Sequence, residues 1–271
     1  MTASTAAIRL IALDLDGTVV GADLVVRERV RAAVAAAQAR GIALTIVTGR
    51  MFAAARPYAH ALGLTGPIVC YQGAGIFDIV TGAIIAQINV QQDVTRDVLR
   101  KAREDAIHAQ CYADDRLYVD SVDRFTKVYT DLARIEPIVV PSLIKVFAER
   151  PTLKIVLVAD AERATAYLEP LHAFLGERAY ITRSHSDFVE ILDPTVNKGR
   201  ALRIVAEHHG VPLEAVMAVG DSWNDLPLLE TAGFGVAMGS APRELMDRAQ
   251  AVVGDVAHDG VAEAIERFAL Q

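Results

Sequence analysis

The fold is decided by the stretch IRLIALDLDGT, residues 8–18, in which an apolar run leads into two aspartates, a glycine and a threonine. The run has the length of a strand buried on both faces, and Gly17 lets the chain turn sharply as it leaves the sheet. Asp14 and Asp16 would then lie together at the carboxyl end of the strand, where open α/β sheets bind their ligands. Two carboxylates that lie so close repel each other unless a divalent cation or a proton compensates their charge.

The composition is that of a globular chain of one or two domains. The chain has 271 residues, of which 52% are hydrophobic, and it contains no low-complexity tract. Such a chain buries a substantial core and is not disordered. The formal net charge of −7 is spread over interspersed acidic and basic residues, so a nucleic-acid partner is not expected.

The cysteines and the chain start indicate a cytoplasmic protein. Cys70 and Cys111 are the two cysteines, and their distance in sequence predicts neither a disulfide framework nor a zinc site. Residues 1–7 lack the cationic start and apolar core of a signal peptide. No apolar run approaches the length that spans a membrane, so no membrane partner is expected either.

The first quarter of the chain alternates strands and helices. The apolar runs at 42–47 and 67–70 read as strands, and the segments 27–40 and 51–62 read as helices. With the strand at residue 8, this order predicts a parallel sheet with right-handed crossovers.

In the middle of the chain the predicted order of helices and strands is different. Residues 76–79 and 84–88 flank a Thr-Gly turn and predict a hairpin. From about 89 to 191, helices alternate with mostly antiparallel strands, beginning with a helix expected over 94–108. We therefore expect an inserted α+β module at 89–191 between two parts of a first domain, 1–88 and 192–271.

A second acidic stretch follows where strands and helices again alternate as in a parallel sheet. The segment VGDSWND, residues 219–225, again takes an apolar strand into a glycine and two carboxylates. In a parallel sheet Asp221 and Asp225 would face the same crevice as Asp14 and Asp16. Four carboxylates in one partly dry cleft require a metal ion, and hard oxygen ligands favour Mg²⁺ over zinc.

Four motifs in order resemble the signatures of the haloacid dehalogenase (HAD)-like superfamily, and the chain resembles its Cof-type phosphatases with a class IIB cap. The motifs are DLDGT at 14–18, TGR at 48–50, NKG at 197–199 and GDSWND at 220–225. The stretches 236–241 and 259–261 also match the pattern of that subgroup. The resemblance implies a doubly wound, Rossmann-like parallel sheet core of α/β class with an inserted α+β cap domain.

The resemblance also implies the chemistry of each acidic residue. Asp14 would attack phosphorus and form an aspartyl-phosphate, and Asp16 would act as general acid and base. Mg²⁺ would be held by Asp14, the backbone carbonyl of Asp16 and Asp221. Asp225 would orient the metal's waters or the nearby lysine.

The remaining motif residues would bind the substrate. Thr48, Lys198 and Asn224 would hold the phosphoryl oxygens, with the charge of Lys198 contributing most. Gly49 and Arg50 are candidate substrate contacts, although a structural salt bridge explains Arg50 equally well. Gln72 is a further candidate, because it stands where the family often has asparagine before a Gly-Ala pair.

The sequence thus predicts a Mg²⁺-dependent phosphatase that hydrolyses small phosphorylated metabolites, with sugar phosphates favoured. A phosphotransferase or phosphomutase of the same superfamily is the nearest alternative, and a non-hydrolytic phosphate-binding regulator is another. Asp16 argues against the regulator, because a protein that must keep its phosphoryl group gains nothing from an adjacent acid and base. Neither the particular metabolite, nor the cap residues that select it, nor the oligomeric state follows from the sequence.

Overall fold

The computed structural model describes residues 7–271, which divide into two compact units. The first unit contains the described residues up to Gly49, Ala55–Ile85 and Asn197–Gln271, and the second contains Arg50–Ala54 and Ala86–Val196. The prediction about the chain start falls almost entirely on residues 1–6, which lie outside the described range. Within that range, no helix is both long and apolar enough to cross a membrane.

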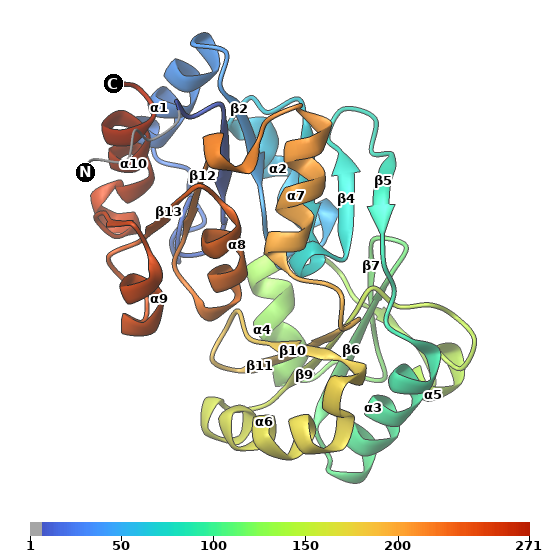
Figure 1. Ribbon diagram of the computed structural model, residues 1–271. Coiled ribbons are helices and arrows are strands. Elements are labelled where there is room, and N and C mark those ends of the chain that lie inside the picture. Colours follow the sequence, from blue (N-terminus) through green and yellow to red (C-terminus); the bar gives the residue numbers. More distant parts are fainter. Residues whose placement is uncertain (1–6) are drawn as a thin grey trace. The chain divides into compact units, whose positions relative to one another are not determined.

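A parallel sheet of five strands forms the centre of the first unit, in the order β14-β13-β12-β1-β2 (Figure 1). Its strands are β1 (Leu10–Leu13), β2 (Ala43–Ile46), β12 (Val216–Gly220), β13 (Phe234–Ala237) and β14 (Ala251–Val252). All residues of β1 and β12 are buried, as expected for central strands covered on both faces.

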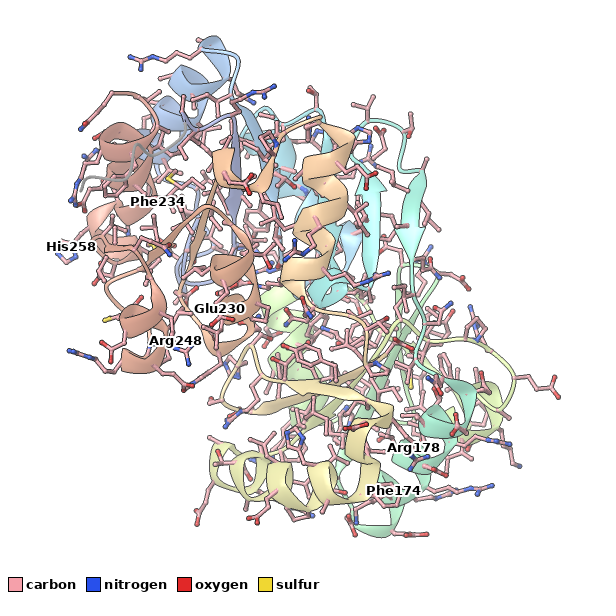
Figure 2. The ribbon with its side chains drawn as sticks, viewed as in Figure 1. Phe174, Arg178, Glu230, Phe234, Arg248 and His258 are labelled. Carbon is pink, nitrogen blue, oxygen red and sulfur yellow. The ribbon has the colours of Figure 1, made fainter. Side chains whose placement is uncertain are left out.

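Helices flank this sheet, and four of them pack in two pairs. They are α1 (Glu28–Ala39), α2 (Phe52–Ala61), α7 (Lys198–His208), α8 (Leu226–Thr231), α9 (Arg243–Arg248) and α10 (Gly260–Phe268). Helix α1 packs against α10, and α7 packs against α8 (Figure 1). On the surface, Arg248 of α9 lies 2.9 Å from Glu230 of α8, and both side chains are labelled in Figure 2. The doubly wound α/β core predicted from the sequence is confirmed.

The third predicted strand has the expected bounds but lies mainly in another sheet. Strand β3 (Pro67–Cys70) pairs antiparallel with β4 (Gly75–Asp78), and β5 (Ile84–Gln87) completes a sheet of three strands. A parallel bridge between Val47 and Val69 links it to the parallel sheet, and Thr45 of β2 donates from Oγ1 to the carbonyl of Pro67 at 2.9 Å. The alternation of strands and helices predicted that β3 joins the parallel sheet, but the tight turn after Cys70 gives it an antiparallel partner instead.

The second unit is built on a sheet of six strands in the order β10-β11-β9-β6-β7-β8. The strands are β6 (His108–Ala113), β7 (Arg116–Val119), β8 (Ile138–Val139), β9 (Lys154–Val158), β10 (Tyr180–Thr182) and β11 (Phe188–Leu192). Neighbours are antiparallel except β7 and β8. The mixture of helices and mainly antiparallel strands confirms the predicted α+β class of the insertion.

The two faces of this sheet differ in chemistry. Helices α3 (Gln92–Glu104), α5 (Leu143–Val146) and α6 (Ala161–Leu175) share an apolar cluster with one face, to which Cys111 contributes. The neighbouring residues Gln110 and Tyr112 point to the other face, since side chains alternate along a strand. There Tyr129 of α4 (Arg124–Ala133) packs edge-on against Tyr112, with 5.2 Å between the ring centroids.

Strand β6 was missed by the sequence interpretation, which extended a helix over 94–108. Helix α3 ends at Glu104, and the chain turns at Ala106 in the left-handed region, with φ of 50°. An alanine at such a turn gives no sequence signal, because glycine or asparagine is the residue expected there. His108 consequently begins a central strand rather than ending a helix.

Candidate active site

Three of the four aspartates predicted to gather, Asp14, Asp221 and Asp225, meet at one edge of the sheet of the first unit. Strands β1 and β12 are parallel neighbours with Leu13 opposite Val219, so Asp14 and Asp221 leave the sheet at the same edge. One carboxylate oxygen from each of Asp14, Asp221 and Asp225 lies within 4.8 Å of the others. Among the described residues this is the group arranged to hold a metal ion.

Lys198 binds two of these carboxylates at once. Its Nζ lies 2.5 Å from Oδ1 of Asp14 and 2.6 Å from Oδ1 of Asp225. The lysine is the first residue of α7, and the side chain of Asn197 caps this helix by accepting from the backbone N–H of Arg200. The cap fixes the start of α7 and therefore the point from which the lysine reaches the carboxylates.

Hydrogen bonds from the backbone and from Thr18 orient Asp221 and Asp225. Oδ2 of Asp225 accepts from the backbone N–H groups of Asp221 and Ser222, each at 3.0 Å. Thr18 donates from Oγ1 to Oδ1 of Asp221 at 2.8 Å. Our site prediction omitted Thr18, although a hydroxyl residue directly after Gly17 was a usable signal. Gly17 itself has φ of 83°, and a Cβ there would lie 2.2 Å from Asp221, so this position requires glycine.

Burial changes the ionisation of this cluster. Burial and the charge of Asp225 raise the pKa of Asp14 well above its ordinary value, while Lys198 opposes the rise. Burial, together with Asp225, raises the pKa of Asp221 to about 7. Burial would lower the pKa of Lys198, but the charges of Asp14 and Asp225 outweigh it and the pKa is raised. The lysine therefore stays cationic, and the carboxylates need further positive charge to ionise fully.

The other predicted site residues are distributed over both compact units. Thr48 is buried next to β2, and its backbone N–H donates to Val69 at 2.9 Å. Gln72 accepts from Nδ2 of Asn224 at 3.0 Å, and a Cβ on Gly49 would lie 2.3 Å from the Gln72 amide nitrogen. Arg50 is buried and falls in the second unit. The structure thus brings Gly49, Gln72 and Asn224 together.

A family model for haloacid dehalogenase-like hydrolases matches residues 11–265. The chain belongs to this family. Among relatives of the haloacid dehalogenase-like chain is a putative phosphatase of Bacillus subtilis (strain 168), 28% identical over 97% of this chain and 98% of the relative. Another is a pyridoxal phosphate phosphatase of Escherichia coli (strain K12), 29% identical over 95% of this chain and 97% of the relative.

A solved structure from the same family has the same fold. A haloacid dehalogenase-like hydrolase from Bacteroides thetaiotaomicron aligns with a TM-score of 0.85 and 27% identity, over 96% of this chain and 99% of that one. The resemblance stated from the motifs is therefore confirmed at the level of family and fold. The family match and the phosphatases among the relatives support a phosphatase enzyme.

The donor set of the cluster fits a divalent metal. Asp14, Asp221 and Asp225 offer carboxylate oxygens, which are the ligands that hard cations prefer. Together the three carboxylates carry more negative charge than the ammonium of Lys198 can balance. Burial makes this excess charge costly in free energy. Since both oxygens of Asp225 already bind Lys198 or backbone N–H groups, Asp14 and Asp221 are the better placed direct ligands.

Proposed function

We propose that this protein is a Mg²⁺-dependent phosphatase that hydrolyses small phosphate monoesters, with sugar phosphates favoured, through an aspartyl-phosphate intermediate. The observation that carries the proposal is the buried contact of Lys198 with both Asp14 and Asp225, beside Asp221. A lysine in this place holds a carboxylate in position and supplies a fixed positive charge where a phosphoryl group would bind.

In the first step, a carboxylate oxygen of Asp14 attacks phosphorus and the bond from phosphorus to the ester oxygen breaks. The departing alkoxide takes a proton from Asp16, so that the products are an alcohol and the aspartyl-phosphate of Asp14. Asp16 suits this role by position, two residues after the nucleophile and half-buried.

In the second step, water attacks the phosphorus of the intermediate while Asp16 takes a proton from it. The bond between phosphorus and the Asp14 oxygen breaks, which releases inorganic phosphate and restores the carboxylate. Dividing the reaction into two displacements lets one pair of carboxylates serve both as nucleophile and as acid and base.

The remaining residues bind and orient. We assign Thr48, Lys198 and Asn224 to the phosphoryl oxygens, and Asp225 to the orientation of Lys198. Asp14, the backbone carbonyl of Asp16 and Asp221 would hold Mg²⁺, which when bound neutralises charge on the phosphoryl oxygens. Gly49, Arg50 and Gln72 are kept as substrate contacts.

The second unit is the proposed selector of substrates. It contains the segment 89–191 within Ala86–Val196, together with Arg50–Ala54, and we assign to it the cap function that the family resemblance implies. A relative that acts on pyridoxal phosphate makes that ester a competitor of sugar phosphates as the substrate. A cytoplasmic location stays a prediction from the sequence.

The deciding experiment measures inorganic phosphate released from a panel of metabolite phosphates by the purified full chain with Mg²⁺. We expect release without any added acceptor alcohol, and the highest kcat/KM on a sugar phosphate. Turnover that requires an acceptor and yields a new phosphate ester would instead identify a phosphotransferase. Phosphorylation of Asp14 without release would identify a regulator. If pyridoxal phosphate gives the highest kcat/KM, the phosphatase assignment stands and the sugar preference is wrong.

A further inference from the structure

A buried turn after β3 holds the side chain of Gln72 against segments that come from distant parts of the chain. The backbone N–H of Gln72 donates to the carbonyl of Thr48 at 3.0 Å. The amide of Gln72 lies so close to Gly49 that a Cβ there would approach its nitrogen to 2.3 Å. The next residue, Gly73, leaves no room for a side chain, since a Cβ would lie 2.5 Å from the carbonyl oxygen of Asn197.

The backbone of this turn is strained. Tyr71 and Gln72 both adopt left-handed conformations, with φ of 53° and 59°. Residues with a Cβ adopt this region at a cost in free energy, and two in succession persist only where surrounding contacts hold them. Within this turn, the strained residues are Gln72, whose side chain contacts Asn224, and its neighbour Tyr71.

The contact between Gln72 and Asn224 determines how the Asn224 amide points. Nδ2 of Asn224 donates to Oε1 of Gln72 at 3.0 Å. Both side chains are at least 96% buried. Oδ1 of Asn224 is buried too, and it has no hydrogen-bond partner among the described residues. A buried carbonyl oxygen without a donor is costly, so this oxygen points to a ligand that brings an N–H or O–H group.

A phosphoryl group cannot be that donor. The oxygens of a phosphate monoester dianion accept hydrogen bonds, and they repel a carbonyl oxygen. Nδ2 of Asn224 has a second hydrogen, which suits a phosphoryl oxygen, while Oδ1 suits a donor on another part of the substrate. One amide would thus contact the substrate on both sides of the ester bond.

We propose that Gln72 is a positioning residue that orients Asn224 so that its Oδ1 accepts from a hydroxyl on the carbon next to the esterified carbon. This inference rests on the proposed function, and it names the substrates as phosphate esters of vicinal diols, such as sugar and polyol phosphates. Simple alkyl and aryl phosphates lack the hydroxyl and leave the buried oxygen unsatisfied.

The test compares two phosphonates that bind without being hydrolysed. 3-Hydroxypropylphosphonate stands for the monophosphate of ethylene glycol, and propylphosphonate lacks only the hydroxyl. Dissociation constants are measured by calorimetry with Mg²⁺ for the full-length wild type, Gln72→Met and Gln72→Glu. Methionine has similar length and no strong acceptor, whereas glutamate can still accept from Nδ2 of Asn224.

We expect the wild type to bind the hydroxylated phosphonate at least about tenfold more tightly, the effect of one well-placed buried hydrogen bond. In Gln72→Met the preference should fall below about threefold, because the Asn224 amide can rotate. In Gln72→Glu both phosphonates should bind more weakly, because of the added negative charge, but their ratio should persist.

Several results would overturn the inference. They are a wild type without the preference or without measurable binding, a Gln72→Met variant that keeps it, and a Gln72→Glu variant that loses it. The last result would mean that Gln72 donates to Asn224 rather than accepts. Hydrolysis of p-nitrophenyl phosphate is measured in parallel. If it proceeds while the preference is absent, only this inference fails, and if no monoester is hydrolysed, the proposed function fails.

Discussion

Each compact unit buries one lysine against carboxylate oxygens, and the two sites differ in their balance of charge. Lys198 in the first unit lies 2.5 Å and 2.6 Å from Asp14 and Asp225, with Asp221 beside them. Lys154 in the second unit lies 2.7 Å from Glu190. The first cluster has more negative than positive charge, whereas the second pair sums to zero.

This difference in charge balance suits the first cluster to a bound cation and the second pair to a structural role. A buried pair of opposite charges compensates its own loss of hydration in part, and further hydrogen bonds complete it. Around Lys154, the ring of Tyr112 lies 5.1 Å away, and Ser184 donates to Glu190. Around Lys198, three carboxylates compete for one ammonium, and a bound cation would restore the balance.

The largest effect should follow from Asp14→Asn. The amide keeps the shape of the side chain but is not a competent nucleophile, so kcat should fall roughly a thousandfold or more, equivalent to about 4 kcal/mol. The melting temperature should not fall, because the substitution removes a buried negative charge from a cluster with an excess. Steady-state hydrolysis measures kcat, and thermal unfolding measures the melting temperature.

The stereochemistry at phosphorus provides a sharper check of the role of Asp14. The wild type hydrolyses, in isotopically labelled water, a monoester whose phosphoryl group is made chiral with oxygen isotopes. Attack by Asp14 followed by attack of water on phosphorus makes two displacements, so the released phosphate should retain the configuration. Inversion would contradict the covalent route and leave Asp14 as a metal ligand.

Removal of divalent cations should have nearly as large an effect on the first unit and little on the second. EDTA should abolish hydrolysis and Mg²⁺ should restore it, since the excess carboxylates need a cation for substrate binding and catalysis. Ca²⁺ should restore little, because it prefers looser and higher coordination. Circular dichroism should show that the chain stays folded throughout. Full activity in chelated buffer would disprove the metal requirement.

Glu190→Gln should act on stability. Loss of one partner leaves Lys154 as a buried charge without its carboxylate, which costs about 3–5 kcal/mol in the free energy of unfolding. Denaturant titration, followed by a signal from the second unit, measures this change in the free energy of unfolding. The double variant Lys154→Met with Glu190→Gln is the matched control, and it should recover part of the loss because both members of the pair are then neutral. If Glu190→Gln were as stable as the wild type, the contrast drawn between the two lysines would be wrong.

Periodicity and motif spacing predict the regular part of the first unit. Buried strands of four and five residues, β1 and β12, are readable because nearly every side chain is apolar and a glycine follows or ends each run. Parallel neighbours present their carboxyl ends at one edge, and for that reason Asp14 and Asp221 could be expected together. These arguments depend on local pattern alone.

The features that escaped prediction depend on backbone conformations that the residues adopting them do not signal. Ala106 and Gln72 both adopt positive φ without being glycine, and each redirects the chain. Because the turn at Ala106 could not be predicted, neither could β6, which follows it. The conformation of Gln72 allows its contact with Asn224, which lies 152 residues further along the chain. Surrounding packing imposes such conformations, so they cannot be read from a residue's own preference.

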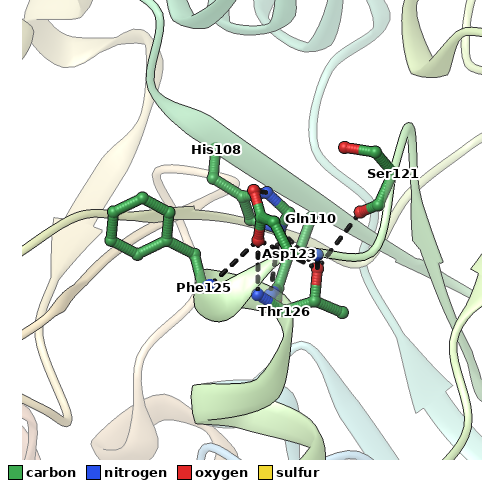
Figure 3. Close-up of polar contacts among 6 residues, drawn as sticks. All are labelled: His108, Gln110, Ser121, Asp123, Phe125 and Thr126. Atoms are coloured by element: carbon green, nitrogen blue, oxygen red, sulfur yellow. Dashed lines mark hydrogen bonds and ion pairs between the residues drawn. The ribbon is translucent and has the colours of Figure 1, made fainter.

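A smaller effect concerns the second unit, where we expect His108 to lower the stability of the fold at acidic pH. His108 donates from Nδ1 to Asp123, whose other oxygen caps α4 by accepting from the backbone N–H groups of Phe125 and Thr126 (Figure 3). Burial lowers the pKa of His108, although the charges of Asp123 and Asp120 oppose the shift. Burial alone would raise the pKa of Asp123, but the helix N–H groups and His108 lower it.

The sign of the pH effect follows from which state binds the proton. Below about pH 6.5 an unfolded histidine is protonated, whereas His108 in the folded chain is not until the pH reaches its lower pKa. The contribution of His108 to the free energy of unfolding should therefore fall as the pH drops from 7 to 5, by about 1.4 kcal/mol for each pKa unit between the two states. Asp123 stays ionised over this range and adds no slope of its own.

His108→Gln should flatten this part of the stability curve, because glutamine does not titrate. His172→Gln, at an exposed position of α6, controls for the loss of an imidazole and should leave the slope near that of the wild type. Urea unfolding at a series of pH values, with Mg²⁺ constant, provides the slopes. An unchanged slope in His108→Gln would show that this histidine is protonated equally in both states. In that case burial would not have depressed its pKa, and the acid response of the second unit would need another source.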